Sequence, residues 1–250
     1  METEVNKLEV CTANVDSALA AQKGGAHRIE LCDNLPEGGT TPSAGMIKRI
    51  KNVINIDIYV MIRPRGGDFY YSELEFKVMM DDIRFCREHG VDGVVIGCLN
   101  RNGTVNKPKT KQLIEYAWPM RVTFHRAFDL TPDPLAAMED IIECGADRIL
   151  TSGQKNTAPE GSSLIRDLVK GADKRIIIMP GSGINETNIL DLKAKTGATE
   201  FHMTGKTLIN SQMEYRKELV QMGSSEDISA YKLMVSSEEK IRKVVSLLKS

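Results

Sequence analysis

KLEVCTANVDSALAAQKGGAHRIELCD, residues 7–33, contains one complete strand–helix–strand unit. Apolar and polar residues alternate in KLEVCTA, and Asn14 can cap the helix that follows it. Gly24 and Gly25 end that helix, and RIELCD at residues 28–33 is predicted to form the second strand. Because a helix separates the two strands, we expect them to lie parallel in one sheet with a right-handed crossover.

The same alternation of strand and helix continues through the chain. Eight such units in 250 residues predict an α/β fold of the (β/α)8 TIM barrel type. An open doubly wound sheet is the alternative, but its usual GxGxxG is absent after the first strand, where residues 11–14 are CTAN. We expect residues 1–250 to form a single domain, with an irregular segment at about 206–235 before the last helix. The six further strand segments are DIYVMIRP (57–64), DGVVIG (92–97), MRVTFHRAF (120–128), RILTSG (148–153), RIIIMPGSG (175–183) and TEFHMTG (199–205).

Composition excludes several classes of partner. Lys and Arg number 33 against 34 Asp and Glu, so the net charge is −1 and no basic stripe indicates nucleic acid. The N-terminal METEVNKLEV has no apolar core of a signal peptide, and no apolar run approaches the roughly 20 residues that span a bilayer. Five widely spaced cysteines do not form a disulfide pattern. We therefore expect a cytoplasmic protein with reduced thiols and no membrane partner.

Polar residues near the strand ends share one parity. Alternate side chains of a barrel strand point into the lumen, and active sites of TIM barrels lie at the C-terminal ends of the strands. A structural ion-pair network remains an alternative for the charged members. The position of His125 favours a functional role, because the residue lies late in its strand and Arg126 and Asp129 follow it closely. The residues of this parity are Glu9, Cys11, Glu30, Cys32, Met61, Arg63, Arg65, Thr123, His125, Ser152, Glu200, His202 and Thr204.

Glycine-rich turns follow the seventh and eighth strands. Gly181, Ser182 and Gly183 stand before a predicted helix, and Thr204 begins the turn after the eighth strand. In many TIM barrels these two loops bind phosphate through free backbone N–H groups and a helix N-terminus. We expect an anion-binding loop here, with a tight turn that merely requires glycine as the alternative.

Two cysteines occupy matching positions on neighbouring strands. Cys11 and Cys32 each fall near the end of a strand, so their sulfur atoms could approach one another. Cu(I) prefers thiolate ligands, although buried cysteines are more often packing residues. A zinc hydrolase barrel would carry HxH on the first strand, and CTAN at residues 11–14 does not supply it.

Together, the motifs resemble the CutC family of copper-homeostasis proteins. The matching blocks are ELCDNLPEGGTTPS, MIRPRGGDFYYSELEF, DGVVIGCLNRNG, TFHRAFD, RILTSGQ, IMPGSGI and EFHMTG, in order over about residues 8–205. The resemblance implies a TIM-type barrel, a cytoplasmic location, a homodimer or homotetramer, and a link to copper tolerance. It also implies that Cu(I), if bound, would be held by Cys11 and Cys32.

Two main hypotheses follow, with a barrel that serves only as an interaction scaffold as a weaker third option, and the choice between enzyme and non-enzyme stays open at this point. The first is a copper-homeostasis protein that binds Cu(I). The second is an enzyme acting on a small anionic metabolite, either phosphorylated or carboxylated, with Glu30, His125 and His202 as candidate acid–base residues. Its anion-binding residues would be Glu9, Arg63, Arg65, Asp68, Arg126, Asp129, Ser152, Gly181, Ser182, Gly183 and Thr204.

Overall fold

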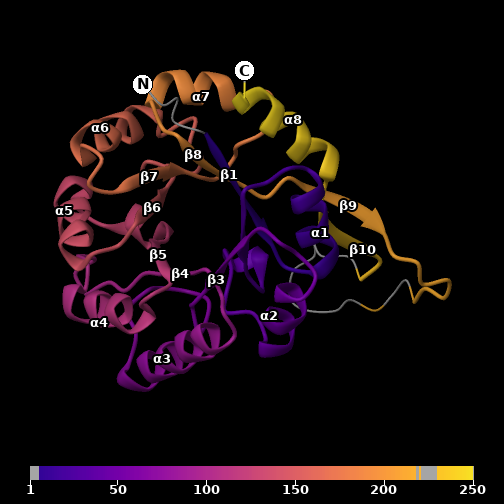
Figure 1. Ribbon diagram of the computed structural model, residues 1–250, viewed down its shortest axis with the longest axis horizontal. Coiled ribbons are helices and arrows are strands. Elements are labelled where there is room, and N and C mark those ends of the chain that lie inside the picture. Colours follow the sequence, from indigo (N-terminus) through magenta and orange to yellow (C-terminus); the bar gives the residue numbers. More distant parts are fainter. Residues whose placement is uncertain (1–5, 218–219, 221–229, 250) are drawn as a thin grey trace.

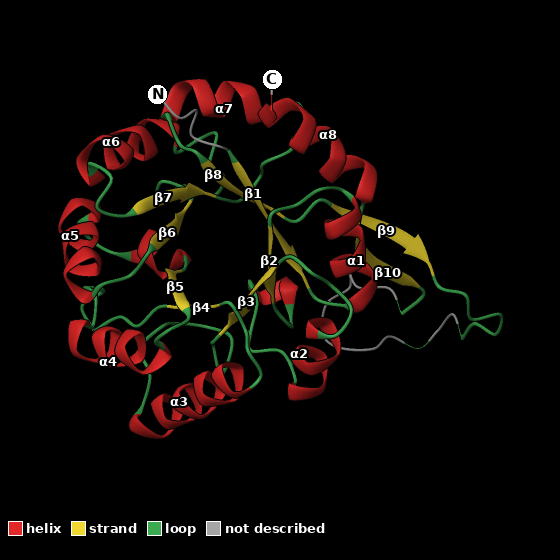
Figure 2. Cartoon of the chain, in the orientation of Figure 1, coloured by secondary structure: helices red, strands yellow, loops and turns green. Residues whose placement is uncertain are grey.

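The computed structural model describes residues 6–217, 220 and 230–249, and its centre is a ring of parallel strands (Figure 1). The strand order is β7-β6-β5-β4-β3-β2-β1-β8, and each neighbouring pair in that order is parallel. Figure 2 shows helices surrounding the strands on all sides. The predicted TIM barrel is therefore confirmed. The strands are β1 (Lys7–Thr12), β2 (Arg28–Leu31), β3 (Asp57–Met61), β4 (Gly93–Ile96), β5 (Arg121–Phe124), β6 (Arg148–Thr151), β7 (Ile177–Pro180) and β8 (Glu200–Met203).

The outer layer consists of helices that connect successive strands. Asn14 caps the first helix by accepting a hydrogen bond from the Ser17 backbone N–H at 2.8 Å. Ser72 and Glu75 form a reciprocal capping box at the start of the third. Residues of the opposite strand parity, such as Leu8 and Phe201, pack between strands and helices with no exposed surface. The helices are α1 (Val15–Lys23), α2 (Ala44–Lys51), α3 (Glu73–Glu88), α4 (Lys107–Ala117), α5 (Pro134–Cys144), α6 (Ser162–Ala172), α7 (Ile189–Thr196) and α8 (Glu238–Lys249).

The ring has one seam, between β7 and β8. Among the described residues, hydrogen-bonded ladders join all neighbouring strands of the ring except β7 and β8. The two strands still lie side by side, because a Cβ atom added at Gly181 would be 3.3 Å from the Cβ atom of His202. The barrel is thus closed by packing at the seam and by backbone hydrogen bonds elsewhere.

The fifth strand ends sooner than its sequence suggested. RVTF forms β5, and the chain then turns into a short 3-10 helix over Arg126–Leu130. His125 caps this turn, since its Nδ1 accepts a hydrogen bond from the backbone N–H of Ala127 at 3.1 Å. The apolar residues Ala127 and Phe128 resemble a continuing strand, but they are buried by the turn.

The segment expected to be irregular, at about 206–235, contains an antiparallel strand pair. β9 (Lys206–Asn210) pairs with β10 (Lys232–Ser236), with Leu208 opposite Met234. Residues 218–219 and 221–229 of this segment lie outside the described residues. The pair extends from the barrel beside α1 (Figures 1 and 2), and the Ser236 N–H donates to the hydroxyl of Ser17 at 2.9 Å. The prediction of an irregular segment was wrong at both of its ends, where short alternating runs pair with each other.

In the described part of the chain, none of the helices combines the length and the apolar character needed to cross a membrane.

Candidate functional site

The base of the barrel lumen holds a network of buried ion pairs. Arg28 donates to Glu9 through Nε and to Glu200 through Nη2, the latter at 2.8 Å. Arg148 donates from Nε to the same Glu200 at 3.0 Å and from Nη1 to the Tyr59 hydroxyl at 3.1 Å. Each guanidinium also faces the Tyr59 ring, at 4.6 Å for Arg28 and 5.2 Å for Arg148. These contacts compensate the desolvation of charges that have lost almost all access to water.

Strand register explains why Glu9 contacts both the arginine network and His202. Glu9 on β1 lies beside Arg28 of β2 on one side and beside His202 of β8 on the other. His202 Nδ1 is 2.8 Å from Glu9 Oε1, and its Nε2 is 3.7 Å from Glu30 Oε2. The imidazole therefore lies between two buried carboxyl groups, one of which also pairs with an arginine.

Two thiols complete the cluster. Cys11 and Cys32 are buried, and their Sγ atoms are 3.7 Å apart. Cys32 also lies 3.4 Å from Glu30 Oε2, so this carboxyl group contacts both the thiol pair and the imidazole. Ligand atoms within 4.8 Å of one another form two candidate metal groups, Cys11–Glu30–Cys32 and Glu9–Glu30–His202. We name the five residues Glu9, Cys11, Glu30, Cys32 and His202 the thiol–imidazole cluster.

The environment shifts the pKa values of these groups in opposite directions. Burial alone would raise the pKa of Glu9, but the charge of Arg28 and the hydrogen bond with His202 lower it to about 2. Burial raises the pKa of Glu30 well above its ordinary value. Burial opposes the charge on His202, yet the neighbouring Glu30 and Glu9 raise its pKa well above the ordinary range. A hydrogen bond from Cys32 lowers the pKa of Cys11 to about 5.

The pKa shifts favour opposite charges on neighbouring groups. The raised pKa values of Arg28 and His202 favour their positive forms, and the lowered pKa values of Glu9, Glu200 and Cys11 favour their negative forms. Glu30, whose pKa is raised next to Cys11, favours its protonated form. Groups in contact that compete for a proton in this way are typical of functional sites.

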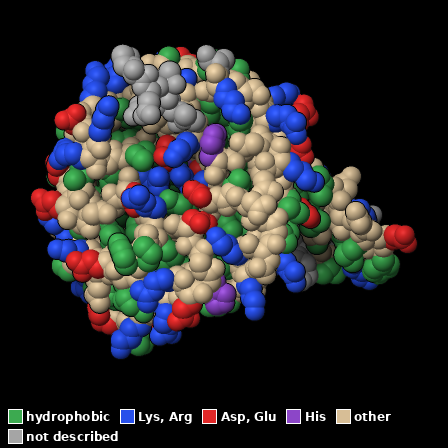
Figure 3. Space-filling view, viewed as in Figure 1, with side chains coloured by type: hydrophobic (Ala, Val, Ile, Leu, Met, Phe, Trp, Pro, Cys, Tyr) green, Lys and Arg blue, Asp and Glu red, His purple; other side chains and the backbone are tan. Residues whose placement is uncertain are grey.

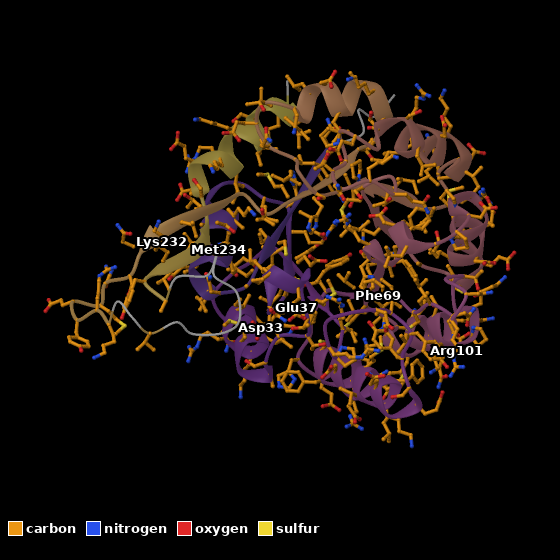
Figure 4. All side chains as sticks on the ribbon, turned by 180° about the vertical axis from the view of Figure 1, so that it is seen from behind. Asp33, Glu37, Phe69, Arg101, Lys232 and Met234 are labelled. Atoms are coloured by element: carbon orange, nitrogen blue, oxygen red, sulfur yellow. The ribbon has the colours of Figure 1, made fainter. Side chains whose placement is uncertain are left out.

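A separate polar group lies at the C-terminal mouth around Phe69. The Arg63 guanidinium lies 4.9 Å from the centre of the Phe69 ring, and the centre of the His125 ring is also 4.9 Å from it. Figure 4 shows Phe69 with Asp33 and Glu37 toward the middle of this face, all from loops that follow β2 and β3. Burial, and then the charge of Arg63, lower the pKa of His125 to about 3.

Arg126, Asp129 and Ser152 are brought together, as a link between two loops. Arg126 donates to Asp129 Oδ2 at 2.8 Å and to the Ser152 hydroxyl at 2.7 Å. Asp129 also accepts from the Thr151 hydroxyl at 2.5 Å and from the Gln154 N–H at 3.1 Å. The carboxylate is thus occupied by groups of the chain itself, which ties the turn after β5 to the loop after β6.

Arg65 and Asp68 lie together in the loop after β3. Arg65 donates to Asp68 Oδ1 at 2.9 Å and to Glu75 Oε1 at 2.5 Å. It also donates to the backbone carbonyl of Tyr70 at 2.9 Å. These bonds hold the loop against the start of α3.

The glycine turns after β7 and β8 are held by local bonds. The Ser182 hydroxyl donates to the Asn156 carbonyl at 2.8 Å, and the Gly183 carbonyl accepts from the Asn188 side chain at 2.8 Å. Gly181 N–H donates to the Thr151 carbonyl at 2.9 Å, and the Thr204 carbonyl accepts from Ser236. Because α7 begins only at Ile189, anion binding by these turns stays a prediction.

Three residues of the lumen were not predicted from the sequence. Arg28, Tyr59 and Arg148 have the same parity as Glu30, Met61 and Ser152 on their strands, so extending the alternation toward each strand's N-terminus would have found them. Figure 3 shows acidic and basic side chains gathered over the centre of the ring.

A TIM-type barrel with a buried cluster of thiol, carboxyl and imidazole groups defines the class of this protein. The sequence profile of the CutC family matches residues 6–207, and the chain belongs to this family. A family protein CutC of Parabacteroides distasonis is 51% identical over 236 residues, covering 94% of this chain and 97% of the relative. The human copper homeostasis protein cutC homolog is 44% identical over 243 residues, covering 97% and 89%.

Solved structures agree on the fold. The crystal structure of the CutC protein from Streptococcus agalactiae has a TM-score of 0.76 and 35% identity, covering 80% of this chain and 98% of that one. Phosphoribosylanthranilate isomerase of Thermotoga maritima has a TM-score of 0.59 at 12% identity, covering 98% of each chain, which shows a shared barrel alone. This chain is thus a homologue of the copper-homeostasis proteins CutC.

Proposed function

We propose that this chain acts in cytoplasmic copper homeostasis by binding Cu(I) through Cys11 and Cys32. The observation that carries the proposal is the 3.7 Å separation of the two Sγ atoms inside the barrel. In a tetrahedral site with metal–sulfur bonds of about 2.3 Å and an angle of about 110°, two thiolate sulfurs lie about 3.8 Å apart. The observed separation therefore suits an ion that has a further ligand beside the two thiolates, whereas an ion held linearly by the two alone would require the sulfur atoms to move apart. The copper-homeostasis names of the relatives support the same assignment.

The protonation state of Cys11 favours binding of a cation by the two cysteines. The metal ligand is the thiolate, and the lowered pKa of Cys11 makes it an anion at neutral pH. Cys32 has a raised pKa because its thiol hydrogen-bonds Cys11 in a buried place, so it has to release its proton when the ion binds. Glu30 and His202 lie next to the thiols and would orient them and tune their charge.

The enzyme hypothesis draws less support from the contacts. Arg65 and Arg126 are paired with carboxylates of their own loops, and Asp129 is saturated by internal donors. Of the three acid–base candidates, Glu30 and His202 lie against the thiols, and the pKa of His125 is lowered to about 3 by burial, which makes it a poor base at neutral pH. Copper binding uses the whole cluster, whereas acid–base catalysis would leave the two thiols without a role.

The test is an anaerobic titration of the reduced protein with Cu(I) against a competing chelator. We expect one ion per chain, with affinity falling by more than about 100-fold in the Cys11→Ala/Cys32→Ala variant, since this exceeds the effect of losing outer-shell contacts. Cys98→Ala is the matched control, because Cys98 is equally buried but outside the cluster. Unchanged affinity in the double variant would refute the assignment. Light scattering of the same samples tests the expected homodimer or homotetramer.

A further inference from the structure

Arg63 is a buried cation without a counter-charge. Its side chain lies at the mouth and the residue is 4% exposed. Nη1 donates to the carbonyls of Glu37 at 2.8 Å and Gly39 at 2.7 Å, and Nη2 donates to the carbonyl of Gly67 at 2.8 Å. In the described part of the chain its partners are neutral, namely these carbonyls, the Phe69 ring and the nearby Tyr71 hydroxyl, and its Nε forms no hydrogen bond. A buried charge held only by dipoles is stabilised further when an anion pairs with it.

His125 supplies a second unused donor. Its Nδ1 accepts from the Ala127 N–H, so the proton of the neutral ring is on Nε2. That Nε2 atom is buried and has no partner, and the residue is 3% exposed. A lone buried N–H of this kind loses its hydrogen bond to water without compensation, which points to a bound group at this place.

Both side chains lie against Phe69 at the C-terminal side of the barrel. Arg63 follows β3 and His125 follows β5, with lumen-facing parity on both strands. The intervening strand β4 is followed by Gly97, where a Cβ atom would overlap the His125 ring. Phe69 contacts the guanidinium and the imidazole together, and the unpartnered hydroxyl of Thr123 lies two residues before His125.

We propose that the Arg63 Nε–H and the His125 Nε2–H bind the carboxylate of a small organic acid beside Phe69. One full positive charge and one neutral donor match a single negative charge, which favours a carboxylate over a phosphate dianion. Among the described residues, no hydrogen bond or ion pair joins Arg63 or His125 to the thiol–imidazole cluster, so the two sites use different side chains. The chain thus offers an organic-acid site and a soft-metal site within one barrel.

The experiment titrates the full chain with acetate and with pyruvate, using acetamide and inorganic phosphate as comparison probes. Histidine labelled with ¹⁵N reports the Nε2–H of His125 directly, so the wild-type protein alone can decide the question. We expect saturable shifts of this signal with the carboxylates, none with acetamide, and weaker binding of phosphate.

Variants separate this site from its surroundings. Arg63→Gln and His125→Phe should each weaken carboxylate binding by about tenfold or more, as expected for a charge-assisted hydrogen bond. Arg84→Gln, which removes an exposed charge on α3, should leave it unchanged. The Cys11→Ala/Cys32→Ala variant should also keep it, which distinguishes this site from the copper proposal. An unmoved His125 signal at saturating carboxylate overturns the proposal, and tighter binding of phosphate overturns the choice of ligand.

Discussion

Arg28→Met is the sharpest test of the charge network in the lumen. The substitution keeps most of the side-chain volume but removes the guanidinium from Glu9 and Glu200. Each lost hydrogen bond to a charged partner contributes about 1.5–3 kcal/mol, so the two together contribute about 3–6 kcal/mol. Glu9 keeps His202 and Glu200 keeps Arg148, which reduces the loss. We expect the free energy of unfolding to fall by about 3–5 kcal/mol, as for other broken buried pairs.

Urea unfolding followed by circular dichroism measures this loss. Arg121→Met is the matched control, because Arg121 also begins a strand and pairs with a carboxylate, Asp147, at 2.6 Å. Its side chain is 70% exposed, so solvent screening should hold the change to about 0–1 kcal/mol.

A double variant identifies the origin of the loss. Adding Glu9→Gln to Arg28→Met removes the carboxylate that has lost its arginine partner. The double variant should therefore recover about 1–2 kcal/mol of the free energy of unfolding. A loss below about 1.5 kcal/mol for Arg28→Met, or no recovery in the double variant, would show that the network contributes little net stability.

Three further perturbations test other contacts. Because the pKa of Glu9 is lowered to about 2, its stabilisation is complete above its ordinary value of 4.5 and is lost as pH falls toward 2; acid unfolding of Glu9→Gln should therefore be less steep in that window, and an identical slope would contradict this. Gly97→Ala places a methyl group against the His125 ring and should lower the free energy of unfolding by about 1–3 kcal/mol, whereas an unchanged melting temperature would show that the ring moves freely. Asp133→Ala removes the N-cap of α5, whose carboxylate accepts from the backbone N–H groups of Leu135 and Ala136. It should lower the free energy of unfolding in urea by about 1 kcal/mol, and Asp133→Asn is the conservative comparison.

The barrel and its polar lumen could be predicted because both depend on periodicity. Alternation of period two placed Glu9, Glu30 and His202 on the inside, and the structure joins them through contacts of 2.8 Å and 3.7 Å. The approach of the two cysteines was expected from matching strand positions, whereas the register places Cys11 opposite Glu30 and Cys32 two residues beyond it. Backbone register then fixed which side chains meet, and register is a property of paired strands that a single segment does not reveal.

The loop residues could not be assigned in the same way. Arg65 and Arg126 have the residue type of an anion clamp, but their donors are used by Glu75 and by Asp129. Whether a polar group is free depends on partners that come from other loops, and sequence spacing does not give their positions. The strand pair β9–β10 was missed for a related reason, since its two strands are separated by more than twenty residues.

The seam between β7 and β8 gives the barrel a preferred place to open. Among the residues that the structure describes, β8 forms a backbone ladder only with β1, and His202 of the thiol–imidazole cluster belongs to this half-paired strand. Local opening needs the least free energy where the fewest backbone bonds break, so the edge amides of β8 should exchange with deuterium before those of β2 or β3. The ion site that we propose beside this strand would then load and release an ion at the rate of a local fluctuation, without global unfolding of the barrel.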